Sequence, residues 1–139
     1  MAKTYSPKRV SVSFRGVLLT GFAPDTFVTA ERNEDAFTLE VGSDGESSRT
    51  ASANQSGTVT LTLMQTSASN DALSAAALQD ETNQSGTGAL LVKDASGRTV
   101  VLAAEAWIRR RAAAEFGSEQ STREWVFETG NLEIFNGGN

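Results

Sequence analysis

The chain contains neither cysteine nor histidine among its 139 residues. Without cysteine, disulfides, thiol nucleophiles and thiolate metal sites are excluded. Without histidine, the chain also lacks the most common general base and the most common metal ligand. Both absences argue against an enzyme.

Long apolar runs are absent as well, and hydrophobic residues make up only 39% of the chain. No segment approaches the roughly 20 apolar residues that span a bilayer. The start, MAKTYSPKRVSVSF, alternates instead of forming the apolar core of a signal peptide. We therefore expect a soluble protein that remains in the cytoplasm after synthesis, folded as a single domain over residues 1–139.

Positive charge is in deficit. Lys and Arg total 12 against 17 Asp and Glu, which gives a formal charge of −5. Proteins that grip nucleic acid do so largely by neutralising phosphates with basic side chains. The acidic balance makes this chain a poor candidate for a DNA-binding module, although it suits a surface to which DNA must not stick.

The patterns that are present are mainly those of β-strands. Alternation predicts strands at 10–14 and 17–20, joined by a turn at Arg15-Gly16, and further strands at 27–32, 37–41 and 89–93. A long strand at 100–109 is expected to place its even-numbered residues on one apolar side. A polar connection, 110–124, then leads to short strands at 125–127 and 132–135.

The clearest pattern lies in SGTVTLTLMQTSASNDALSAAALQ, residues 56–79. Thr58, Thr60 and Thr62 alternate with aliphatic residues, so one face of this strand carries only hydroxyl groups. A helix is predicted at 69–81, capped by Ser67 or Ser69. Leu73, Ala76, Ala77 and Asp80 share one face by helical spacing, and Leu78 broadens its apolar stripe.

The polar segment from about 39 to 57 is predicted to be a protruding loop or hairpin. Asp44-Gly45 within it is a strong hairpin-turn signal. A mobile surface loop without a function is the alternative, because long loops are either functional or disordered. Residues 136–139, NGGN, are expected to form a flexible tail.

Together these elements predict a mainly β protein. Hairpins at the start of the chain favour an antiparallel β-sandwich or small barrel with one flanking α-helix.

Catalytic and ligand-binding motifs are not evident. A paired-carboxylate hydrolase could draw on acidic residues, but carboxylates at turns and on strand faces are usually solvated charges; the candidates are Glu31, Glu34, Asp35, Glu105 and Glu128. We therefore expect no catalytic residues, no cofactor and no metal ion.

Arg109-Arg110-Arg111 is the only basic cluster. It lacks the interleaved aromatic residues of a single-strand nucleic-acid site. We interpret it as a strand end in solvent, or as a group that pairs with acidic residues of a neighbouring subunit. Trp107 and Trp125 are interpreted as core anchors, with a subunit interface as the alternative.

Several stretches, taken in order, resemble the tail tube proteins of tailed bacteriophages, particularly those with contractile tails. They are VSVSFRGVLLTGFAPDTFVTAERNEDAF, VGSDGESSRT, SGTVTLTLMQTSASNDALS, LLVKDASG, AAEAWIR and the terminal EIFNGGN. The resemblance runs from about Val10 to Asn139. Its specificity comes from the number and order of these stretches, since none of them is a catalytic fingerprint.

The resemblance implies hexameric rings that stack into a tube, with strands of neighbouring subunits joined into a continuous inner barrel. It also implies a hairpin that reaches the adjacent ring. The expected inter-ring contacts are Asp44, Gly45, Glu46 and Arg49. The expected inter-subunit or sheath contacts are Trp107, Arg109, Arg110 and Phe135.

The implied partners are further copies of this chain, a tail sheath protein, and baseplate and tail-terminator proteins. Genomic double-stranded DNA would pass through the tube without specific binding, along an acidic or hydroxyl-rich lining. The implied location is the virion, after assembly in the bacterial cytoplasm. The alternatives are a ring-forming terminator or adaptor, a tube protein like that of type VI secretion and, last, a small enzyme on a β scaffold.

Overall fold

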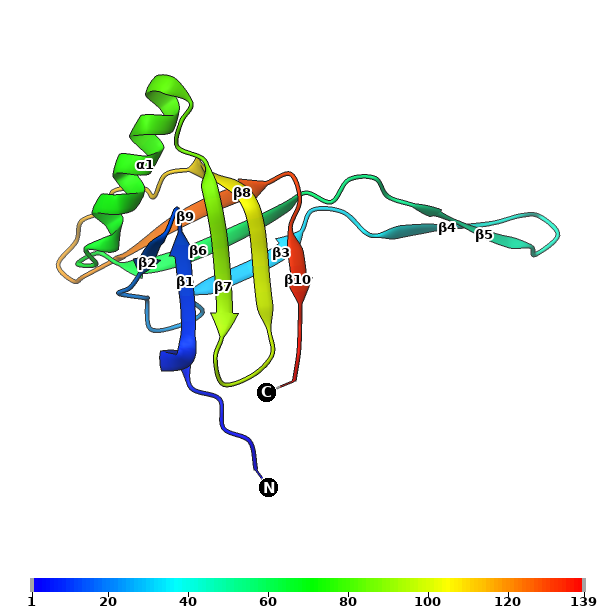
Figure 1. Ribbon diagram of the computed structural model, residues 1–139, viewed down its shortest axis with the longest axis horizontal. Coiled ribbons are helices and arrows are strands. Elements are labelled where there is room, and N and C mark those ends of the chain that lie inside the picture. The colour runs from blue at the N-terminus through cyan, green and yellow to red at the C-terminus, as the bar shows by residue number, and fades with distance from the viewer. Residues whose placement is uncertain (1, 139) are drawn as a thin grey trace.

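The computed structural model describes residues 2–138. Met1 and Asn139, which end the predicted domain and tail, lie outside the described residues. After a short 3₁₀ turn at Pro7–Arg9 the chain forms ten strands and one α-helix (Figure 1). The elements are β1 Val10–Phe14, β2 Val17–Leu19, β3 Val28–Arg32, β4 Phe37–Val41, β5 Ser47–Ala51, β6 Gly57–Met64, α1 Ser69–Asn83, β7 Gly88–Asp94, β8 Val100–Arg110, β9 Thr122–Thr129 and β10 Glu133–Phe135.

Eight of the strands form one antiparallel sheet in the order β2-β1-β7-β8-β9-β6-β3, with β10 also paired to β8. This sheet folds over on itself at β8. The first half of β8 pairs with β7 and β10, and its second half, Ala106–Arg110, pairs with β9. The predicted mainly β, antiparallel fold with one helix is therefore confirmed.

A β-bulge causes the bend in β8. Leu90 of β7 pairs with Ala103, but Gly88, two residues away, pairs with Ala106, so β8 contains one extra residue in this interval. Bulges bend a strand and re-aim its side chains. The prediction that all even-numbered residues of this strand share the buried side is therefore wrong: Val101, Ala103 and Ala106 are buried, whereas Leu102 is exposed.

The two layers of the folded sheet enclose the core. Phe14 of β1 and Phe127 of β9 meet edge to face across it, with ring centroids 5.0 Å apart. Alternate residues of the central strand β6 point into this core, as predicted: Val59, Leu61 and Leu63 are almost fully buried, and the threonines between them are not.

The helix covers one end of the sandwich (Figure 1). It begins at Ser69 as predicted and ends at Asn83, two residues later than expected. Leu73, Ala76 and Ala77 are buried, but Leu78 is 58% exposed. Each residue turns a helix by about 100°, so Leu78 lies a full step away from Ala77 and outside the narrow buried face.

Side chains fix the start of the helix to neighbouring elements, although neither predicted serine forms a cap of the usual kind. Ser69 Oγ accepts a hydrogen bond from the Thr20 N–H at 2.8 Å, and Ser67 Oγ donates to the Thr20 carbonyl. Asn70 Oδ1 accepts from the indole N–H of the buried Trp125, at 3.0 Å. The interpretation of Trp125 as a core anchor is thus confirmed.

One further boundary differs from expectation. β9 begins at Thr122, so the last residues of the predicted polar connection form strand that is paired with β6. The C-terminal residues are bound to the turn between β7 and β8: the Gly138 carbonyl accepts from the Arg98 N–H and the Gly137 carbonyl from Thr99 Oγ1.

Within residues 2–138, no helix combines the length and apolar character needed to cross a membrane.

Candidate assembly surfaces

One layer of the sandwich presents a polar sheet face to solvent. We call β3, β6, β9 and the Ala106–Arg110 half of β8 the four-strand layer. Its inner face belongs to the core, and its outer face contains the β6 threonines. Carboxylates and hydroxyls of the flanking strands share this face by register; they are Thr29 and Glu31 of β3 and Glu124 and Glu128 of β9.

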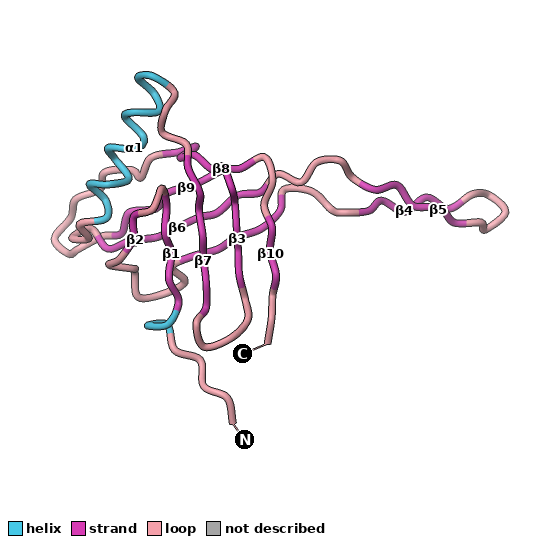
Figure 2. Tube along the Cα trace, in the orientation of Figure 1, coloured by secondary structure: helices cyan, strands magenta, loops and turns pink. Residues whose placement is uncertain are grey.

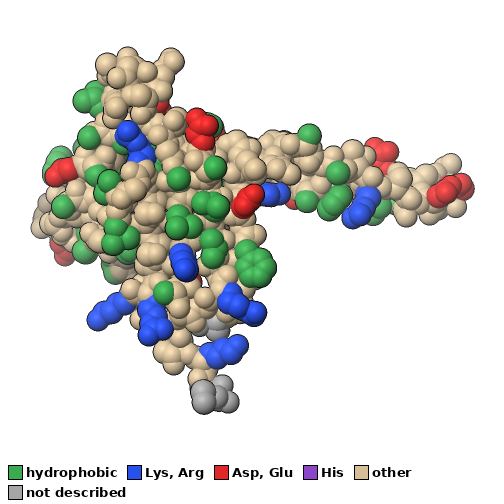
Figure 3. Space-filling view, in the orientation of Figure 1, with side chains coloured by type: hydrophobic (Ala, Val, Ile, Leu, Met, Phe, Trp, Pro, Cys, Tyr) green, Lys and Arg blue, Asp and Glu red, His purple; other side chains and the backbone are tan. Residues whose placement is uncertain are grey.

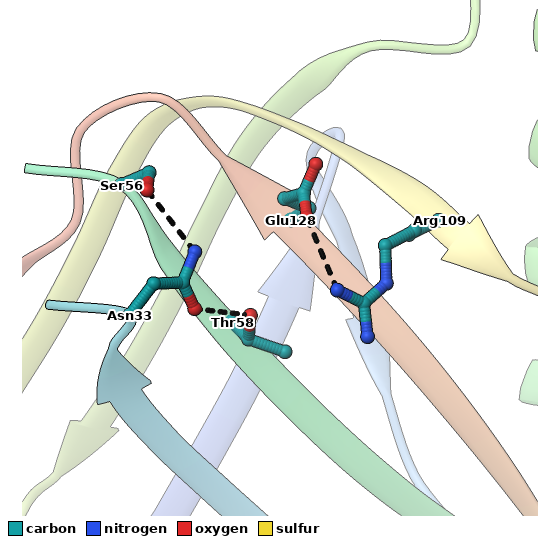
Figure 4. Close-up of polar contacts among 5 residues, drawn as sticks. All are labelled: Asn33, Ser56, Thr58, Arg109 and Glu128. Carbon is teal, nitrogen blue, oxygen red and sulfur yellow. Dashed lines mark hydrogen bonds and ion pairs between the residues drawn. The ribbon is translucent and has the colours of Figure 1, made fainter. Parts of the chain in front are cut away.

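Hydrogen bonds order this outer face (Figure 4). Thr58 Oγ1 donates to Asn33 Oδ1 at 2.8 Å, and Asn33 Nδ2 donates to Ser56 Oγ at 3.0 Å. Arg109 and Glu128 form an ion pair at 3.2 Å. The face therefore combines hydroxyls, carboxylates and Arg109, whose charge Glu128 compensates. By register, Trp107 and Arg110 of β8 and Val126 of β9 also lie on this face.

In the part of the chain that the structure describes, each side of the four-strand layer ends in an unpaired strand edge. β3 is the last strand of the sheet order. On the other side, β7 accompanies β8 only as far as Ala106, so within residues 2–138 no strand pairs with the outer edge of β8 beyond that point. Unpaired edges are templates for pairing with another chain.

A two-stranded arm, Phe37–Ala51, extends away from the sandwich (Figure 2). It begins slightly before the predicted segment 39–57. One of its sides contains Phe37, Leu39 and Val41, which are 51%, 67% and 62% exposed. Arg49 of β5 lies over the Phe37 ring, 4.2 Å from its centroid. Hydrophobic side chains follow the arm and acidic ones lie toward its outer end (Figure 3).

The structure places all four predicted inter-ring contacts on this arm. Asp44 and Gly45 form the turn, where Asp44 Oδ1 accepts from the Glu46 N–H at 3.1 Å. Gly45 has a φ of +88°, which a residue with a side chain rarely adopts. Arg49 lies further back, on β5.

The second predicted group is divided. Trp107, Arg109 and Arg110 lie close together on the β8 half that belongs to the four-strand layer. Trp107 is only half-buried there. Its interpretation as a core anchor is therefore wrong, in contrast to that of Trp125. Phe135 is exposed on β10 and pairs with Val100, at the opposite end of β8.

The apolar side of the arm was missed as a candidate contact. The alternation of Phe37, Leu39 and Val41 is typical of a strand half-buried in its own domain, and nothing local distinguishes it from one buried by a partner. A signal did exist, since the segments that follow are strongly polar and offer little to cover it.

The acidic residues considered for catalysis form no metal-binding group in the described part of the chain. Among residues 2–138 no group of three acidic side chains could hold a metal ion. Every buried side-chain nitrogen or oxygen there has a hydrogen-bond partner. Of the carboxylates considered for catalysis, Glu128 is paired with Arg109.

Comparison with known proteins gives a consistent result. The family model described as "Bacteriophage PhiTE tail tube protein" matches residues 3–137. The "Structural protein ORF10" of Pseudomonas phage KPP10 is 35% identical over 144 residues, covering 98% of this chain and 83% of that protein.

Solved structures share the fold at low sequence identity. The tube-terminating cap of the anti-feeding prophage is 11% identical, with a TM-score of 0.65, covering 97% of this chain and 93% of that one. The sheath/tube terminator of an extracellular contractile injection system is 12% identical, with a TM-score of 0.62 and coverages of 97% and 99%. A chain from the virion of a native gene transfer agent is also 12% identical, with a TM-score of 0.62 and coverages of 96% and 100%.

Proposed function

This chain belongs to the bacteriophage PhiTE tail tube protein family, and on that premise we propose that it assembles into hexameric rings that stack into the hollow inner tube of a phage tail. The family and the KPP10 relative are structural phage proteins, so the chain is a structural component of the virion and not an enzyme. The tube would serve as the conduit through which DNA is ejected into the host cell.

The arm is the observation that carries the proposal. A two-stranded ribbon is only marginally stable alone in water, because it cannot bury enough apolar surface. Here the ribbon also exposes three large apolar side chains in a row: Phe37, Leu39 and Val41. An exposed apolar row of this kind is typical of a surface that a partner covers. The adjacent ring is the partner that stacking would supply, contacted also by Asp44, Glu46 and Arg49.

The outer face of the four-strand layer suits the lining of the tube. Duplex DNA exposes one phosphate about every 1.7 Å of its axis, so a basic lining would hold it. The threonines of β6 and the carboxylates of β3 and β9 offer no such attraction, and Arg109 is paired with Glu128. Within the described residues, Arg110 is the one arginine of this face without an ion-pair partner. DNA could then slide through without specific binding.

Negative-stain electron microscopy of the purified protein tests the proposal, with tubes as the expected result. Deletion of residues 44–48 should leave a folded subunit that forms no tubes, because the tip of the arm is removed without touching the core. Circular dichroism checks that the subunit is folded. Normal tubes from the deletion variant would contradict the role of the arm.

A terminator that forms a single ring is the second candidate, since two of the solved structures with this fold are tube-terminating proteins. The same micrographs separate the two: a tube protein forms stacks of rings, and a terminator forms isolated rings. In either role we propose contacts with sheath, baseplate and other tail proteins, and assembly in the host cytoplasm.

A further inference from the structure

We propose that the joint between neighbouring subunits of a ring is made by two specific edges of the four-strand layer. The free edge of β3 in one copy pairs antiparallel with the Ala106–Arg110 half of β8 in the next copy, and Glu31 forms an ion pair there with Arg110. This inference rests on the proposed assembly into rings, and it names the strands and the charges that close them.

The backbone of β3 is ready for such pairing. Phe27 and Asn33, on either side of β3, bond to β6 through Thr62 and Ser56. In an antiparallel ladder the bonded residues alternate. The N–H and C=O groups of Val28, Ala30 and Arg32 therefore point toward the free edge, where the described part of the chain provides no strand.

The two edges are compatible in direction. β3, β6, β9 and β8 alternate in direction, since each neighbouring pair is antiparallel. β8 therefore runs opposite to β3 within one subunit. Rotation about a ring axis preserves strand direction along that axis, so β8 also runs opposite to β3 of the next subunit. A head-to-tail contact of this kind closes into a ring.

The charges at the two edges are complementary. Acidic side chains are exposed on and around β3: Asp25, Glu31, Glu34 and Asp35. Arg32 is the only cation on β3, and its Nε donates to the Leu132 carbonyl at 2.9 Å. At the other edge β8 ends in Arg109 and Arg110 and continues into Arg111.

Within this arginine triplet, Arg110 is the member whose charge is not compensated inside the subunit. Arg109 is paired with Glu128 and Arg111 with Glu81, and no ion pair within residues 2–138 involves Arg110. Arg110 lies opposite Val126, and both β9 neighbours of Val126 point into the core. Val126 and Arg110 therefore lie on the outer face, which also carries Glu31. Pairing with Glu31 of the next copy would also remove an uncompensated cation from the lining of the tube.

Charge reversal tests the joint. Arg110→Glu and Glu31→Arg should each raise the protein concentration needed for half-maximal assembly by about tenfold, because a close attractive pair becomes repulsive. The double variant should restore assembly toward the wild-type level. Lys93→Glu, which changes the charge as Arg110→Glu does but lies on β7, is the matched control and should assemble normally. Assembly is followed by sedimentation velocity and electron microscopy.

Disulfide cross-linking provides an independent test of the joint. Because the chain has no cysteine of its own, only the introduced cysteines can form a disulfide. Under oxidising conditions the Glu31→Cys/Arg110→Cys variant should give a ladder of covalent oligomers, and either single variant should give none. Tubes that form without cross-links, and without rescue by the double reversal, would overturn the joint while leaving the proposed function intact. Wild-type protein that forms neither rings nor tubes would refute both.

Discussion

At the scale of single residues, the start of β6 is an example of tight packing in which a glycine is required. Gly57 begins β6 directly against Leu132, which is fully buried. A Cβ at position 57 would overlap the Leu132 side chain. By contrast, a Cβ at Gly130 would meet nothing within 4 Å. The two glycines thus differ in packing, although neither requires a left-handed backbone.

Gly57→Ala should lower the free energy of unfolding by about 1–3 kcal/mol, since overpacking a filled core forces its neighbours to shift. Gly130→Ala should change it by no more than about 0.5 kcal/mol. Urea denaturation followed by circular dichroism measures both. Equal stability of the two variants would show that Leu132 can move aside without cost.

At the scale of elements, the arm and the sandwich have separate roles. The arm is a two-stranded sheet of its own, and every residue of β4 and β5 is exposed. Its apolar side therefore contributes little to the stability of the subunit. This apolar side does not stabilise the subunit and is exposed to water. A contact that forms on assembly best explains it.

The double substitution Phe37→Ser/Leu39→Ser should leave the free energy of unfolding within about 0.5 kcal/mol of wild type, since these side chains lie outside the core. Tube formation should nevertheless be lost, as seen by electron microscopy. The control, Thr38→Ala/Glu40→Gln, alters the opposite side of the same strand and should still assemble. Tubes of normal yield from the serine variant would assign stacking to another surface.

At the scale of the whole molecule, the bend in β8 separates two environments on the outside of the sandwich. It directs the four-strand layer, with its threonines and glutamates, away from the layer formed by β1, β2, β7 and β10. In a ring, one layer could then line the channel while the other faces outward. The electrostatic consequence is local, since salt screens charges beyond roughly 8 Å at physiological ionic strength.

Tubes carrying Thr60→Lys/Thr62→Lys should retain duplex DNA that wild-type tubes release, because the added cations would contact phosphates and displace counterions. Retention is measured as DNA protected from nuclease when tubes assemble in its presence, and it should fall steeply with added salt. Thr60→Gln/Thr62→Gln adds similar bulk without charge and should protect no DNA. Protection by wild-type tubes would contradict a non-binding lining.

The sequence by itself determined the local features of this protein. Alternation set which residues of β6 enter the core, because successive side chains of a strand point to opposite faces. Asp44-Gly45 predicted the turn of the arm, because glycine adopts positive φ at no steric cost. The helix was predicted from its small residues and its position after the strand.

Only the tertiary structure decided how these elements divide between core and partner. The bulge in β8 depends on its pairing with β7, so simple alternation assigned Leu102 to the wrong side. Trp107 and Trp125 are the same residue type on neighbouring strands, yet only Trp125 is buried in the core, where its indole N–H donates to Asn70. Burial is a property of what surrounds a side chain, and the chain pattern alone does not specify those surroundings.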